Sequence, residues 1–119
     1  MMDPIVVSIP IGSLGTANRE VLHVPSTHGG ITLTAAYVVC GSTSTCVMSL
    51  NNNGTSPGTA ISSNVGTLPV ASSTLTANVP AAMTISTAYQ AKNTWVAVQS
   101  VSGITDANAQ LVLEYKFGK

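Results

Sequence analysis

The chain has 119 residues, which fits one domain with a core of useful size. Its formal net charge is +0, so the composition gives no indication of a nucleic acid or an anionic membrane as partner. Charged residues make up only 7% of the chain, against about 25% in an ordinary soluble domain. Because a surface with so little charge favours association, the composition fits an assembled protein better than a solitary enzyme.

Residues 1–15 are apolar but lack the features of a signal peptide. Asp3 stands where a cationic region would be expected, and Pro4 and Pro10 interrupt the apolar run. No segment reaches the roughly 20 apolar residues that a membrane span requires. We therefore expect synthesis in the cytosol and no membrane partner.

Residues 5–11 alternate in the manner of a strand, and two roles fit them. They form either the first strand of the domain's own sheet or an arm that adds to the sheet edge of a neighbouring chain. The chain accordingly divides into residues 1–19, an N-terminal arm or first strand, and residues 20–119, the β-domain. In the arm role, the candidate partner contacts are the residues of the apolar face: Ile5, Val7, Ile9 and Ile11.

Strand patterns dominate the rest of the chain. Alternation of apolar and polar residues predicts strands at 31–39, 45–50 and 109–117, and residues 94–101 are apolar on both faces, as in a strand covered on two sides. Shorter candidates are 20–25, 59–63, 73–80 and 83–87. A helix could lie only at 81–92, but Thr84, Ile85 and Thr87 are poor helix formers, so a strand is expected there too. Strands with this spacing, separated by Gly and Pro, predict an antiparallel β-sandwich or a barrel.

The segment "LNNNGTSPGTAISS", residues 50–63, predicts a connection between two strands. Asn53-Gly54 is a dipeptide that tolerates positive φ, so a tight hairpin turn is expected there. Strand patterns flank the segment closely, which argues against a flexible linker. If it touches a partner, we expect backbone and amide hydrogen bonds from Asn51, Asn52, Asn53 and the following residues, without chemistry.

The two cysteines, Cys40 and Cys46, lie on either side of a turn-like segment. They could approach the Cα separation of about 5.5 Å that a disulfide needs. They could equally be two small buried apolar residues at strand ends. A zinc site is not expected, because only His23 and His28 could complete it and their spacing fits no familiar pattern.

The sequence contains no arrangement typical of an enzyme. Its carboxylates are scattered, so no pair is expected to flank a scissile bond, and no nucleophile-elbow motif is present. We therefore expect no catalysis, no metal and no cofactor. The aromatic residues could form a sugar-stacking platform, although core packing is the simpler expectation for an indole on an apolar strand. The residues of that platform would be Trp95, Tyr37, Tyr89, Tyr115 and Phe117.

Four stretches together resemble small jelly-roll virion proteins of tailed bacteriophages. They are "GITLTAAYVV" (30–39), "TCVMSLNNNGTS" (45–56), "NTWVAVQSVSG" (93–103) and "AQLVLEY" (109–115). The resemblance extends over residues 20–115 and concerns the rhythm of strands and turns, because the family has no catalytic signature. It implies an all-β antiparallel sandwich of jelly-roll type with about eight strands over residues 20–119.

The resemblance also implies a function, that of a capsid decoration (cement) protein. Such a protein would bind and stabilise the lattice of the major capsid protein, would be found on the capsid surface of the virion after synthesis in the host cytoplasm, and would associate with itself as a trimer or dimer. Many such proteins have more acidic residues than this chain, which leaves the position in the virion open. The alternatives are a tail, neck or fibre accessory domain and a carbohydrate-binding or adhesin module. Exposed coplanar aromatics including Trp95 would favour the sugar-binding alternative.

Overall fold

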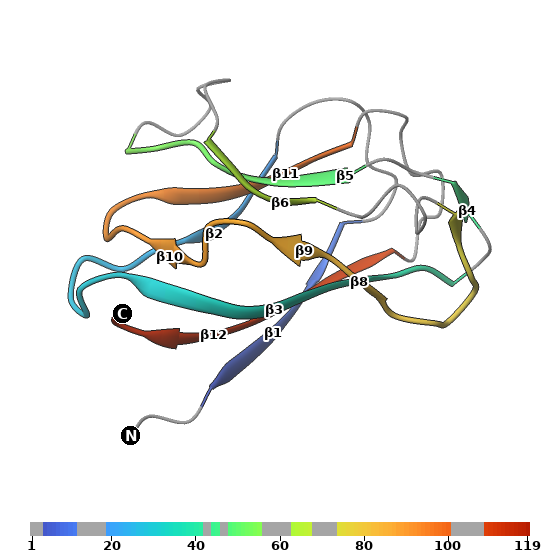
Figure 1. Cartoon of the computed structure of the whole chain (residues 1–119), viewed down its shortest axis with the longest axis horizontal. Coiled ribbons are helices and arrows are strands. Elements are labelled where there is room, and N and C mark those ends of the chain that lie inside the picture. The colour runs from blue at the N-terminus through green and yellow to red at the C-terminus, as the bar shows by residue number, and fades with distance from the viewer. Residues whose placement is uncertain are drawn as a thin grey trace.

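The structure is a computed structural model that describes residues 4–11, 19–41, 44–45, 48–55, 63–67, 74–100 and 109–119. In these ranges the chain forms strands and no helix, and none of the described segments is a helix long and apolar enough to cross a membrane. Two five-stranded sheets face each other (Figure 1). The expected all-β antiparallel sandwich is confirmed.

The first sheet has the order β1-β12-β3-β10, with β8 also paired to β3. Its strands are β1 (Ile5–Pro10), β12 (Gln110–Phe117), β3 (Ile31–Val39), β10 (Tyr89–Gln90) and β8 (Ala81–Ala82). The second sheet has the order β2-β11-β5-β6-β9. Its strands are β2 (Arg19–His23), β11 (Trp95–Ser100), β5 (Met48–Asn52), β6 (Ser63–Thr67) and β9 (Thr84–Ile85). A separate two-stranded sheet joins β4 (Ser44–Thr45) and β7 (Thr74–Leu75).

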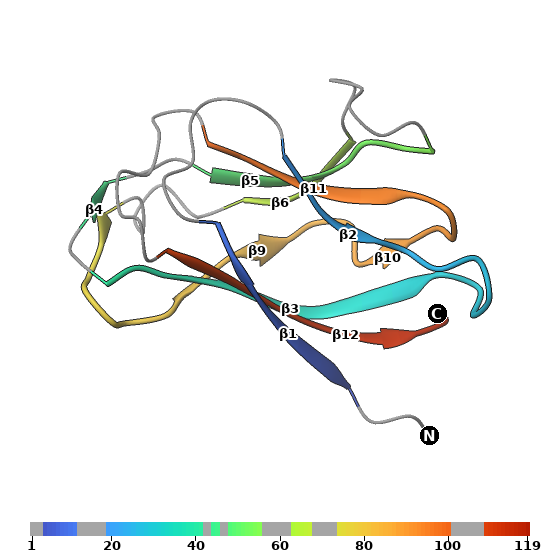
Figure 2. The ribbon, with the colours of Figure 1, turned by 180° about the vertical axis from the view of Figure 1, so that it is seen from behind.

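The strand pairings are nested along the chain. β1 pairs with β12, β2 with β11, β3 with β10, β4 with β7 and β5 with β6, and every pair is antiparallel. The β1–β12 and β3–β10 pairs belong to the first sheet, the β2–β11 and β5–β6 pairs belong to the second, and the β4–β7 pair forms the separate sheet. Figures 1 and 2 show the result from both sides, with β1, β12 and β3 in one layer and β2, β11 and β5 in the other.

The core lies between the sheets and explains the alternation in the sequence. On β3, the buried side chains of Leu33, Ala36 and Val38 face inward, and on β12 those of Leu111 and Leu113 do the same. The spacing between Leu33 and Ala36 departs from strict alternation because β3 has a bulge there: Tyr115 pairs with Leu33 and Glu114 with Ala35, which leaves Thr34 as the extra residue. A half-buried strand needs a period of two, and that is why β3 and β12 were predictable from sequence.

The connection after β5 differs from the predicted hairpin. Gly54 has a φ of +74°, as expected for the Asn-Gly dipeptide. However, Asn52 pairs with Ser63, so residues 53–62 separate the strands and the prediction of a tight turn is wrong. After β5 ends, the backbone continues along β11, because Asn53 N–H donates to Trp95 O and Trp95 N–H donates to Gly54 O. Most of the predicted strand at 59–63 lies outside the described residues.

Candidate interaction surfaces

The N-terminal segment is a strand of the chain's own first sheet. β1 pairs with β12 over its full length, from Ile5 opposite Tyr115 to Pro10 opposite Gln110. Of the predicted contact residues, Ile5, Val7 and Ile9 are half-buried against the core, and Ile11 is 1% exposed. These four side chains therefore serve the core of the sandwich. Their predicted role in a partner interface stays a prediction, and what β1 offers to a partner is its other face and its outer edge.

The outer edge of β1 has main-chain groups available for pairing. Ile11 N–H donates to Ala109 O, so the odd-numbered residues from Ile5 to Ile11 direct their backbone N–H and C=O groups toward β12. The alternate residues, Pro4, Val6, Ser8 and Pro10, direct theirs away from it. Pro10 is tolerated within the strand because it has no N–H to donate at that outer position. In the described part of the chain no other strand pairs with this edge.

Asn52 lies in a polar cluster that joins the two sheets. Its Nδ2 donates to Gln90 Oε1 at 2.8 Å and to Thr94 Oγ1 at 2.9 Å, while its Oδ1 accepts the N–H of Gly54 at 2.8 Å. Gln90 is 2% exposed, and its Nε2 donates to Thr87 O at 2.8 Å. The amide of Asn52 therefore holds the short strand β10 of the first sheet to the end of β5 in the second.

The amides of Asn51 and Asn53 are also occupied within the chain. Both residues are buried, with 3% and 4% of their surface exposed. Asn51 Nδ2 donates to Ser49 Oγ at 3.2 Å, and Asn53 Nδ2 donates to Glu20 Oε2 at 2.7 Å. Because Glu20 is on β2 and Asn53 follows β5, this hydrogen bond spans β11, which lies between those strands. The predicted contacts from Asn51, Asn52 and Asn53 to a partner stay a prediction, but in this structure all three amides stabilise the fold.

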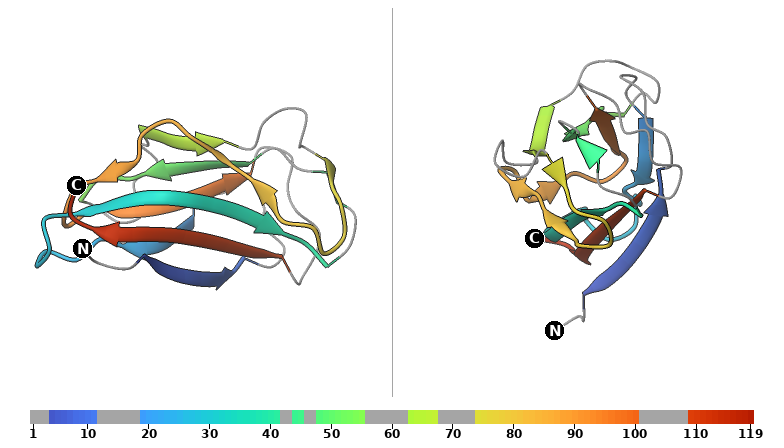
Figure 3. Two further views of the ribbon diagram at one scale, coloured as in Figure 1. Left: turned by 60° about the horizontal axis from the view of Figure 1, so that its bottom comes forward. Right: turned by 90° about the vertical axis from the view of Figure 1, so that its right-hand side faces the viewer.

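The outer face of the first sheet is broad and has little charge. The strands β1, β12 and β3 lie side by side in this sheet (Figure 3). The outward residues of each strand are neighbours of those on the next strand in the pairing register. They are Val6, Ser8, Gln110, Val112, Glu114, Lys116, Ala35, Tyr37, Val39 and, from β8, Ala82. Only Glu114 and Lys116 among them are charged, and Glu114 Oε1 accepts a hydrogen bond from Thr34 at 2.9 Å. Val6, 61% exposed, is one of the two large apolar residues most exposed in the described ranges.

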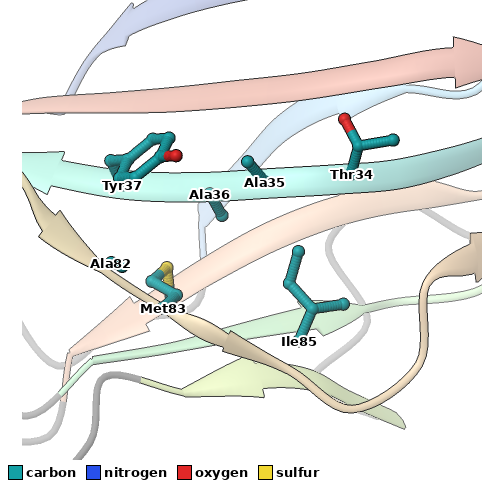
Figure 4. A pocket seen from close by; sticks show the side chains of 7 residues that line it. All are labelled: Thr34, Ala35, Ala36, Tyr37, Ala82, Met83 and Ile85. Carbon is teal, nitrogen blue, oxygen red and sulfur yellow. The ribbon is translucent and has the colours of Figure 1, made fainter.

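A pocket of about 270 Å³ borders this face. It opens at residues 81–90, where β8 and β10 pair with β3 of the first sheet, while β9, between them in the chain, pairs with β6 of the second sheet. Figure 4 shows Tyr37 and Ala35 rising from one side of β3, with Met83 and Ile85 across from them. The lining is mostly apolar, so the pocket extends the weakly polar character of the outer face to the sheet border.

The aromatic side chains do not form one platform. Trp95 is half-buried on the outer side of the second sheet and packs on His23, with ring centroids 4.5 Å apart and planes at 44°. Tyr37 lies on the opposite side of the sandwich, on the outer face of the first sheet. Near the end of β12, His28 stacks on Phe117 at 4.3 Å, and the Lys119 ammonium lies 4.9 Å from the centroid of the Tyr89 ring. A coplanar sugar-binding array that includes Trp95 is therefore not present among the described residues.

The remaining predicted site residues can be placed only in part. Cys40 is buried at the end of β3, where its carbonyl accepts the N–H of Asn78 at 2.7 Å. Cys46 lies outside the described residues, so a bond between the two cysteines stays a prediction. Within the described ranges, no three His, Cys, Asp or Glu side chains gather as a metal site would require.

Neither a scan against models of protein families nor searches of curated proteins and of solved structures found a match to this chain. The function is therefore inferred from the fold and the chemistry of its surfaces.

Proposed function

We propose that the chain is a structural subunit of a virus particle, a decoration or cement protein that binds the capsid lattice of a tailed bacteriophage. Its nested antiparallel strand pairs support a sandwich of jelly-roll type, an architecture that recurs in viral capsid and lectin domains. Because a fold alone does not specify a function, the proposal depends on the surface. The supporting observation is the outer face of the first sheet, where weakly polar side chains on three long strands include only Glu114 and Lys116 as charged groups.

The mechanism of such a protein is burial of surface and not a reaction. Apolar and hydroxyl groups on a rigid sheet can be covered by a capsid protein with little cost of desolvating charge. Each copy would contribute a modest interface, and many copies on one lattice would add their effects. Since few ion pairs would form, attachment should depend weakly on salt. We expect binding to persist at about 1 M NaCl, and release by salt at that concentration would contradict this mechanism.

Val112 provides the test of the face, because it lies at its centre between Ser8 and Tyr37. The variant Val112→Lys is expected to weaken binding at least tenfold, since the interface would bury an unpaired ammonium group. The assay adds the purified chain to capsids prepared without it and measures the bound fraction by sedimentation. Ser26→Lys, a matched charge on the exposed loop between β2 and β3, should bind like the parent chain. Equal binding by both variants would exclude this face from the interface.

The position in the particle distinguishes the decoration role from that of a tail, neck or fibre accessory domain. Antibody against the chain, applied to intact particles from cells that encode it, should label the capsid surface in electron micrographs. Label confined to the tail would replace the first proposal by the second. Absence of the chain from purified particles would reject both.

A further inference from the structure

The outer edge of β1 is complementary to itself. Its N–H donors are those of Val6 and Ser8, and the prolines at positions 4 and 10 offer only carbonyl groups. We propose that this edge pairs with the same edge of a second copy of the chain, antiparallel, about a two-fold axis at Val6. The pairing does not depend on the proposed attachment to a capsid.

In this arrangement every available donor of the edge finds an acceptor. Val6 N–H of each copy donates to Val6 C=O of the other, and Ser8 N–H donates to Pro4 C=O of the other. About four main-chain hydrogen bonds result, in the pattern of an ordinary antiparallel ladder. The carbonyl of Pro10 lies outside the paired region, so its contact with Arg19 Nη2 at 3.5 Å is not disturbed.

The side chains favour a second copy as the occupant. Exposed sheet edges are commonly protected by charged residues, but β1 has none, and its prolines lie only at or beyond its ends. A two-fold axis at Val6 places this 61% exposed side chain beside its own copy, so each covers the other. A two-fold interface uses the same patch twice, which requires the patch to be free of repelling like charges. The uncharged edge of β1, in a chain of net charge +0, meets that requirement.

The first test measures the mass of the chain by sedimentation velocity over a range of concentrations. The parent chain should form a dimer that dissociates on dilution. Val6→Pro should raise the dissociation constant at least about tenfold, because it removes the central donor of the edge. As a control, Val6→Thr keeps the N–H and should dimerise like the parent. A chain that is monomeric at every concentration, or a dimer that Val6→Pro leaves unchanged, would overturn the proposal.

The second test determines the register and does not require the proline variant to fold. In the proposed pairing the Cα atoms of the two Val6 residues lie about 5.5 Å apart, within the range of a disulfide. Val6→Cys should therefore give a covalent dimer on mild oxidation. Ser8→Cys should not, because Ser8 faces Pro4 of the second copy. The parent chain, oxidised in parallel, accounts for Cys40 and Cys46. Crosslinking of Ser8→Cys but not of Val6→Cys would reject the register, and crosslinking of neither would reject the pairing.

Discussion

Replacing Gly30 by alanine is expected to lower the free energy of unfolding by about 3 kcal/mol or more. A Cβ at this position would lie 2.5 Å from Gln90 O and 2.6 Å from the Tyr89 hydroxyl oxygen. Both are closer than nonbonded atoms approach, and Gln90 O belongs to the backbone of β10, which cannot rotate away. Gly30 also has a φ of +92°, a backbone conformation that residues other than glycine rarely adopt. Urea unfolding followed by Trp95 fluorescence would measure the loss.

Gly29 is the matched control for Gly30. It has a φ of +69°, but a Cβ there would meet nothing within 4 Å. Gly29→Ala should therefore cost only the backbone preference, about 1 kcal/mol. The difference between the two losses in the free energy of unfolding therefore measures the cost of the close contact between a Cβ at position 30 and β10. Equal losses would mean that the neighbours of Gly30 move aside, and that the close approach of Gly30 to β10 is not needed for stability.

The long strands were predictable because burial of one face imposes a period of two. β3 and β12 lie next to each other in the interior of the first sheet; β12 alternates buried and outward residues, and β3 does so on either side of its bulge. Residues 81–90 lack such a period. They form β8, β9 and β10, two residues each, which pair with β3, then β6, then β3 again. Each short strand is defined by a partner far away in the chain, so local sequence could predict extended structure there but not its pairing.

The candidate surfaces were less predictable than the fold for a related reason. Alternation at Ile5, Val7 and Ile9 identifies an apolar face, but it does not say whether the covering sheet belongs to the same chain. β1 is placed in its own chain's first sheet by pairing with β12, about a hundred residues away, as the Ser8 to Gln110 hydrogen bond shows by its separation of 102 positions. The apolar face of β1 then packs against the chain's own core. The asparagines presented the same problem. Their amides suggested a partner, whereas those of Asn52 and Asn53 donate to side chains distant in sequence and that of Asn51 donates to Ser49 on the same strand.

The polar cluster around Asn52 leads to the second prediction. Asn52→Ala is expected to lower the free energy of unfolding by about 3 kcal/mol, because it removes three hydrogen bonds and leaves the buried Oε1 of Gln90 without this donor. The same urea titration would measure the loss. Asn51→Ala is the control on the same strand: Asn51 is more deeply buried than Asn52, but among the described residues its side chain donates only to Ser49 Oγ, so the variant should cost about 1 kcal/mol.

A double-mutant cycle tests whether the loss comes from the link between the sheets. If Asn52 acts through Gln90, then Gln90→Ala in the Asn52→Ala background should cost less than in the parent chain, by about 1–2 kcal/mol. Additive losses would show that the two amides stabilise the fold separately. A coupling of the expected size would mean that the Asn52–Gln90 hydrogen bond holds β10 to the second sheet. This contact matters for β10 because its ladder with β3 is only two residues long. The end of the sandwich that contains Gly30 and β10 would then depend on one amide contact between the sheets.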